Sequence, residues 1–120
     1  MVVDDNLAVV ALLDWELAGV GPGELDVAWF CEMNRMRSTG PAGFVPLPGF
    51  PADDMTWARW EAAVGRRADA VGWFQRYSAV RVAVLLQLYL TAMVHRGVLP
   101  AGHRALNENS GTRRLQELFS

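Results

Sequence analysis

The sequence predicts an α+β fold that is mostly helical: a short N-terminal antiparallel β-hairpin followed by four or five helices, with no parallel sheet. Strand-type patterning occurs only before Asp14, and helical periodicity dominates after Pro51. The chain has 120 residues, the length of one domain. Because 52% of its residues are hydrophobic, against the ~45–50% usual in soluble domains, we expect residues 1–120 to form a single partial domain that neighbouring structure would cover.

The N-terminal segment, residues 1–15, has the pattern of a hairpin that ends in an acid. Residues 2–3 and 8–13 are β-branched or apolar runs on either side of an Asp-Asp-Asn turn. A two-stranded hairpin is marginally stable alone, so we expect it to lie on helices or further strands. Asp14 follows the second strand at its open end. From the residues alone, its carboxylate is either a metal ligand or an ordinary turn or helix-capping acid.

A helical part is expected over residues 23–120, beginning with a helix that starts near Asp26. Cys31 lies in an apolar stretch of this helix, and we interpret it as a core residue and not as a reactive thiol. A single cysteine and no secretory signal favour a cytoplasmic location. Four prolines and three glycines make residues 38–52 a loop.

Two more helices are expected after this loop. The first begins at residue 53 or 54 and runs to about Val64, where Gly65 ends it, as glycine commonly does. The longest runs from near Asp69 to about Arg96, because apolar residues recur there at three- and four-residue intervals. A last helical stretch lies in residues 106–119 and is expected to be broken in its middle by Ser110-Gly111. Its apolar side consists of Leu115, Leu118 and Phe119.

The longest helix is apolar nearly all round over residues 79–94, which raises the alternative of a membrane span. Arg81 and Gln87 interrupt this run, and it is shorter than the ~20 residues that a span needs. We therefore expect the central helix of a helical lobe. The charged side chain of Arg81 needs a partner, because burying an unpaired cation in an apolar helix is costly. That partner is either Asp26 or Glu61, in an ion pair, or an anionic group of a substrate.

Several function classes are excluded by composition. The formal net charge is −2 and no basic stripe is present, so nucleic acid is not an expected partner. All eleven basic residues are arginines, so no P-loop lysine is available. His95 and His103 each stand without an acid or cysteine at ligand spacing, which argues against zinc. No Gly-x-Ser-x-Gly motif supports a hydrolase.

Three segments carry a family resemblance: Leu-Leu-Asp-Trp-Glu at 12–16, Gly-Val-Gly-Pro-Gly at 19–23 and Glu-Leu-Asp-Val-Ala-Trp-Phe at 24–30. Together they resemble the C-terminal lobe of the aminoglycoside phosphotransferase family. These enzymes are small-molecule kinases with a protein-kinase-like fold. The resemblance is nearest to the branch that also occurs fused to acyl-CoA dehydrogenases. One difference is that Gly21-Pro22-Gly23 stands where the family has Gly-Asp-Pro, which puts the geometry of that turn in doubt.

The resemblance implies roles for five residues. Asp14 would bind the Mg²⁺ that neutralises the phosphates of ATP. Asp26 would brace the catalytic loop as a buried carboxylate, or it is an acid at the start of a helix that the helix dipole favours. Glu16 would lie close to the metal or on the substrate side, or it is a solvated or structural acid. Trp29 and Arg81 are the other candidates for the substrate side. The family's catalytic Asp and metal-binding Asn would precede Met1, and its nucleotide-binding lysine has no counterpart in this chain.

Two functions follow as expectations. In the first, the chain is the metal- and substrate-binding part of an ATP-dependent phosphotransferase that acts on a small-molecule hydroxyl. It would be inactive alone and would bind neither Mg²⁺ nor ATP tightly. In the second, it is a non-catalytic remnant that binds a ligand or a partner. In either case we expect a homodimer, because the hairpin edge and the residue 79–94 helix would otherwise expose apolar surface.

Overall fold

A computed structural model describes residues 1–15, 18–39 and 49–120 and confirms the expected mostly helical α+β architecture. Two strands, β1 (Val2–Val3) and β2 (Val9–Ala11), form an antiparallel sheet. Four α-helices follow it: α1 (Gly23–Thr39), α2 (Asp53–Val64), α3 (Val71–His95) and α4 (Ser110–Phe119). A 3₁₀ turn at Arg104–Leu106 precedes α4. The order of strands and helices therefore agrees with the prediction.

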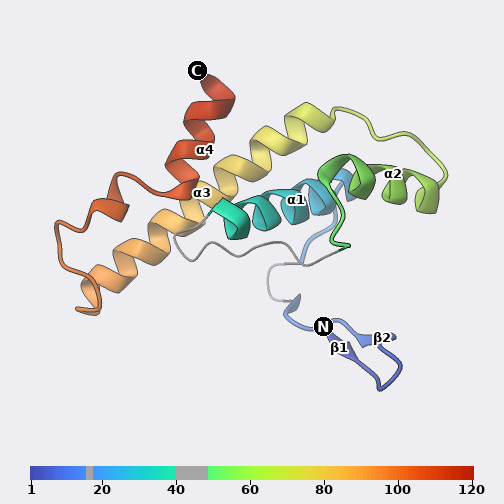
Figure 1. The fold of residues 1–120 in the computed structure, drawn as a ribbon, viewed down its shortest axis with the longest axis horizontal. Coiled ribbons are helices and arrows are strands. Elements are labelled where there is room, and N and C mark those ends of the chain that lie inside the picture. The colour runs from blue at the N-terminus through green and yellow to red at the C-terminus, as the bar shows by residue number, and fades with distance from the viewer. Residues whose placement is uncertain (16–17, 40–48) are drawn as a thin grey trace.

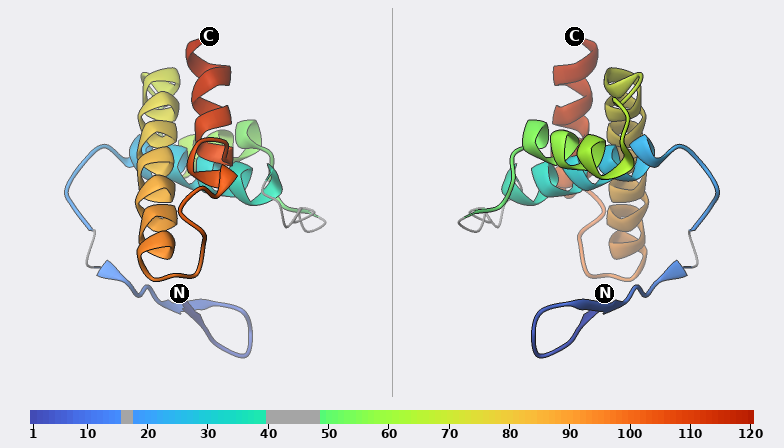
Figure 2. Two further views of the ribbon diagram at one scale, coloured as in Figure 1. Left: turned by 90° about the vertical axis from the view of Figure 1, so that its left-hand side faces the viewer. Right: turned by 90° about the vertical axis from the view of Figure 1, so that its right-hand side faces the viewer.

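The hairpin is closed by its polar turn. The Asp4 carboxylate accepts hydrogen bonds from the backbone N–H groups of Asn6 and Ala8, both at 2.9 Å, which is the local bonding that aspartate favours in turns. The second strand is shorter than expected and ends at Ala11. The hairpin extends away from the helices and packs against none of the described ones (Figures 1 and 2). The expectation that it lies on other structure is therefore not met within the described chain.

The helical part is organised around α3. Helix α1 crosses α3, and α2 lies beside α1 (Figure 1). The C-terminal helix α4 also packs against α3. The core between α1 and α2 is built from Val27, Ala28, Cys31 and Trp57. Small residues on the packed side of α3 let the neighbouring helices approach closely. These are Ser78, Ala79 and Ala83.

The ends of the long helices follow local signals in the sequence. Gly65 ends α2 in a left-handed conformation, with φ of 72°, and its N–H donates to the Glu61 carbonyl. Gly97, with φ of 71°, follows α3. Both ends of α3 lie within two residues of their expected positions. Helix α1 continues to Thr39, into the loop expected at residues 38–52, and residues 40–48 of that loop lie outside the described chain.

The prediction that Ser110-Gly111 breaks the last helix is wrong. These two residues begin α4. Asn109 accepts a hydrogen bond from the Thr112 N–H at 3.0 Å, and the Thr112 hydroxyl accepts one from the Asn109 N–H at 2.9 Å. This reciprocal capping box makes Asn109 the N-cap residue and Ser110 the first residue of the helix. The glycine is needed for packing, since a Cβ there would lie 2.8 Å from the Cα of Ala83.

Among the described residues, α3 is the one helix that is long and apolar enough to cross a membrane when length and composition alone are considered. The same property belongs to central helices of soluble folds. Here α1 and α4 pack along one side of α3.

Candidate functional site

Asp14 lies in an exposed turn beyond β2. Its backbone φ is 72°, a left-handed conformation that aspartate tolerates better than most residues do. The neighbouring Trp15 folds back over the turn, and its indole Nε1–H donates to the Leu12 carbonyl at 2.8 Å. No described residue donates a hydrogen bond to the Asp14 carboxylate. Glu16 lies outside the described residues.

The described residues supply one candidate metal ligand, Asp14, but they do not form a complete metal site. Nowhere in residues 1–15, 18–39 and 49–120 do three or more His, Cys, Asp or Glu side chains come close enough together to hold an ion. Asp14 could therefore supply one carboxylate. Mg²⁺ is commonly bound in this way, by one or two protein carboxylates together with substrate phosphates and water.

Asp26 is in the first turn of α1, where an acid interacts favourably with the helix dipole. Its side chain is exposed, whereas the resemblance implies a buried carboxylate. The contact that the resemblance implies is with a catalytic loop, and that loop is not part of this chain. The bracing role of Asp26 therefore stays a prediction.

The structure brings Arg81 and Trp29 into contact, and Arg81 does not form the ion pair with an acid that we considered from the sequence. The Arg81 guanidinium lies over the Trp29 ring, 4.9 Å from its centroid, and 5.9 Å from the centroid of Tyr77. The expected ion pair with Asp26 or Glu61 is not formed. Glu61 instead pairs with Arg67 at 3.6 Å. Arg81 is half-buried, so the two aromatic faces stabilise its charge where no described carboxylate does.

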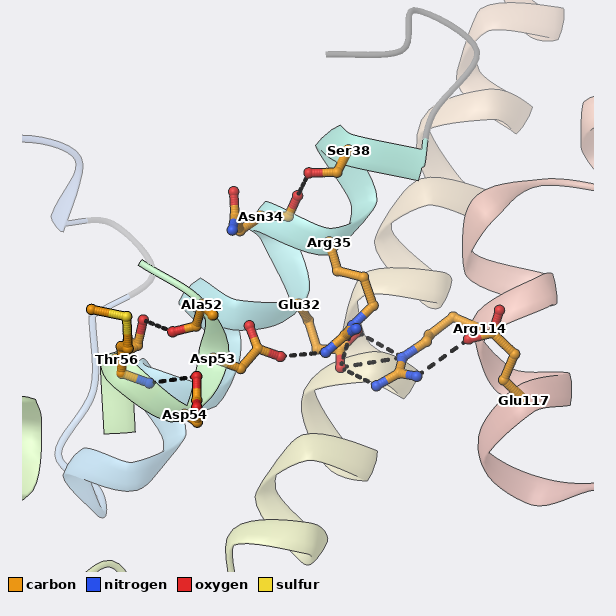
Figure 3. Close-up of polar contacts among 11 residues, drawn as sticks. Glu32, Asn34, Arg35, Ser38, Ala52, Asp53, Asp54, Thr56, Arg114 and Glu117 are labelled. Carbon is orange, nitrogen blue, oxygen red and sulfur yellow. Dashed lines mark hydrogen bonds and ion pairs between the residues drawn. The ribbon is translucent and has the colours of Figure 1, made fainter. Parts of the chain in front are cut away.

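The most elaborate polar arrangement is one that sequence reasoning missed. Glu32 is 3% exposed and accepts hydrogen bonds from two nitrogens of Arg114, Nε at 3.1 Å and Nη2 at 2.8 Å. Arg35 Nε lies 3.7 Å from the same carboxylate, and the Arg35 guanidinium also pairs with Asp53. Arg114 reaches Glu117 at 3.3 Å (Figure 3). We call these five residues the Glu32 cluster.

The Glu32 cluster ties α1, α2 and α4 together. The hydrogen bonds to Glu32 raise the pKa of Arg114, as expected for a guanidinium held by a buried carboxylate. A cavity of about 240 Å³ opens beside the cluster, between α1, α3 and α4. The guanidinium of Arg114 is already engaged by carboxylates, so we interpret the cluster as structural. A signal for it existed in the sequence, because Glu32 directly follows Cys31 on the apolar part of α1 and a buried acid needs a partner.

A second ion pair fastens the loop after α2 to the start of α1. Arg66 Nη1 and Nη2 donate to the Glu24 carboxylate at 2.5 and 3.0 Å. This hydrogen bonding lowers the pKa of Glu24 from its ordinary 4.5 to about 2, although burial opposes the shift. The Arg66 guanidinium also lies over the Trp60 ring, 4.9 Å from its centroid.

Cys31 is a core residue, as predicted. It is 1% exposed and packs with the α1–α2 core. Burial raises the pKa of its thiol to about 12, so the thiolate needed for reactivity is absent at neutral pH.

No protein-family model matches the chain. No solved structure matches it significantly either.

Proposed function

We propose that this chain is the C-terminal, metal- and substrate-binding part of an ATP-dependent small-molecule phosphotransferase of the aminoglycoside phosphotransferase type. The observation that carries the proposal is Asp14. It is a single carboxylate presented to solvent at the open end of a hairpin, in a left-handed backbone conformation, and directly followed by Trp15.

The backbone of Asp14 argues against side-chain helix capping, whereas an ordinary turn acid fits the same conformation. A residue that caps a helix with its side chain normally has an extended backbone. His103 and Asn109 follow this rule, with φ of −61° and −135°, and their side chains accept hydrogen bonds from the helical N–H groups that follow. Asp14 differs from both, since its φ is 72°.

Arg81 and Trp29 are the residues proposed for the substrate side. Because the guanidinium of Arg81 is held by aromatic faces, its N–H groups are not used by a carboxylate of any described residue. An anionic group of the acceptor, such as a carboxylate or a phosphate, fits such a guanidinium. In the complete enzyme Mg²⁺ would neutralise charge on the phosphates of ATP, and Asp14 would be one of its ligands.

The second candidate function is a non-catalytic module that binds a ligand or a partner. The observation that favours it is the amount of uncovered apolar surface. The hairpin packs on no described helix, and one side of α3 exposes large aromatic and aliphatic side chains. An exposed patch of this kind commonly marks an interaction surface.

The test of the phosphotransferase proposal is a paramagnetic NMR experiment on the 120-residue chain with Mn²⁺–ADP in place of Mg²⁺–ATP. Mn²⁺ accepts the same oxygen ligands and broadens the signals of nearby amides. We expect weak binding, broadening centred on residues 12–16, and no phosphotransfer to any acceptor. Asp14→Asn should abolish the broadening. Asp5→Asn, which removes an exposed acid from the tip of the same hairpin, should leave it unchanged.

Broadening that persists in Asp14→Asn, or that is centred on the helices, would contradict the proposal. The coding DNA upstream of Met1 provides an independent check. An in-frame His-Gly-Asp with an Asn five residues after the Asp agrees with the proposal. An upstream sequence without that motif favours the non-catalytic module.

A further inference from the structure

Helix α3 has two sides of different character. One side is buried under α1 and α4 and carries small residues such as Ala79 and Ala83. The other side carries large apolar residues at steps of four, three, four and four positions, which aligns them on one helical face. We call them the α3 stripe: Trp73, Tyr77, Val80, Val84 and Leu88. Their exposed fractions range from 40% for Val80 to 61% for Leu88.

The area of this face approaches one half of a stable interface. Leu85 lies beside the α3 stripe, next to Leu88, with 44% of its surface exposed. Taking ~150–250 Å² for a large side chain, these six residues expose on the order of 600 Å². That is the upper limit of about 300–600 Å² for the largest apolar patch of a soluble monomer. A stable complex buries about 600–1,000 Å² on each partner.

We propose that the α3 stripe is the contact surface for a second copy of this chain, packed antiparallel about a two-fold axis near Val84. Symmetry then places Val80 against the partner's Leu88, and Val84 against the partner's Val84. Tyr77 lies near each end of the contact. It is stacked on Trp73 with ring centroids 5.2 Å apart, which provides a rigid aromatic anchor of the kind that dominates binding energy.

The charges of α3 select the antiparallel direction. The helix contains no acidic residue, and its two arginines, Arg76 and Arg81, both lie in its N-terminal half. A parallel pair would bring four arginines together and align the two helix dipoles. The antiparallel pair keeps these four arginines further apart and makes the two helix dipoles oppose each other.

A second copy explains the face better than a lipid bilayer does. A helix that spans a bilayer must have its remaining sides covered by apolar structure or lipid. The other side of α3 instead packs against α1 and α4, which hold the charged Glu32 cluster. The net charge of −2 also gives no attraction to anionic lipids.

The first test is the mass of the chain in solution at micromolar concentration, measured by light scattering. The expected result is twice the 13.3 kDa of one chain. Val84→Glu places a carboxylate from each copy at the axis and should raise the dissociation constant at least about a hundredfold. Ala58→Glu puts the same acid on an exposed position of α2 and should leave the dimer intact. Because Val84 is 52% exposed in the single chain, Val84→Glu should keep its helical circular dichroism.

The second test reads the direction of packing by thiol cross-linking. The native Cys31 is buried and does not interfere. Val84→Cys should form an intermolecular disulfide under mild oxidation, because a two-fold axis brings this position within the ~7 Å that a disulfide spans. Val80→Cys alone should not cross-link, whereas an equal mixture of Val80→Cys and Leu88→Cys should do so. Self-cross-linking of Val80→Cys would mean a parallel pair and would overturn the proposal.

Two further results would also overturn it. One is a dimer that survives Val84→Glu but is lost in Val10→Glu, since Val10 is exposed on the hairpin and such a dimer would pair through the strand edge. The other is a chain that stays at 13.3 kDa at micromolar concentration. If that monomer also floats with phosphatidylcholine vesicles, the stripe is a lipid contact.

Discussion

Replacing Gly111 by alanine has two opposite effects on stability: alanine has the higher helix propensity, but its Cβ would collide with α3. The residue is the second of α4, and alanine is favoured over glycine inside a helix by roughly 0.5–1 kcal/mol. On propensity alone, Gly111→Ala would therefore stabilise the fold. The structure predicts the opposite. An added Cβ would lie 2.8 Å from the Cα of Ala83 and 3.1 Å from both the Ala83 Cβ and the Asn109 Oδ1.

The loss of stability expected for Gly111→Ala depends on which atoms the new methyl group contacts. The nearest atom belongs to the backbone of α3, so relief requires the two helices to move apart. Overpacking of this kind costs about 1–3 kcal/mol. Gly72, the second residue of α3, is a matched control, because a Cβ there meets only the flexible end of Arg76 at 3.7 Å. Gly72→Ala should raise the free energy of unfolding, and the two variants should differ by about 2–4 kcal/mol.

Urea unfolding followed by far-ultraviolet circular dichroism measures both variants on one scale. Gly111→Ala should lower the midpoint relative to the wild type, and Gly72→Ala should raise it. The change should fall in the midpoint and not in the slope, because the surface exposed on unfolding is nearly the same. A Gly111→Ala variant at least as stable as Gly72→Ala would refute the close approach of α3 and α4.

Two predictions concern the ion pairs. Arg114→Ala should lower the free energy of unfolding by about 3 kcal/mol, because it leaves the buried Glu32 carboxylate without its two-nitrogen partner. Arg113→Ala, an exposed neighbour on the same helix, should change it by less than about 0.5 kcal/mol, and equal losses would contradict the structural role of the Glu32 cluster. The second prediction is a pH dependence. Because Arg66 lowers the pKa of Glu24 from 4.5 to about 2, the pair stabilises the fold above pH 4.5, and this contribution is lost as the pH falls towards 2. Thermal melting between pH 6 and 2.5 should show a smaller decline in Glu24→Gln than in the wild type, and parallel curves would show that the pair does not control acid stability.

The order of strands and helices was predictable because the signals that set it are local. The Asp-Asp-Asn turn closes the hairpin through hydrogen bonds that span at most four residues. Gly65 ends α2 because glycine reaches the left-handed conformation without a Cβ penalty. The apolar periodicity of α3 placed both of its ends within two residues.

The core assignment of Cys31 also followed from local sequence, since it lies in an apolar stretch of α1. The start of α4 shows the limit of such signals. Ser-Gly read alone suggests a break, whereas Asn109 and Thr112 on either side of it form a capping box.

The partners of the charged side chains were decided by tertiary structure alone. Glu32 and Arg114 are 82 positions apart, and Glu24 and Arg66 are 42 apart. Arg81 was expected to pair with an acid, and it lies over Trp29 instead. A sequence shows that a buried charge needs a partner, but helix packing determines which group is within reach. The physical reason is that caps and turns depend on a few neighbouring residues, whereas ion pairs and close helix contacts depend on how distant elements are oriented in space.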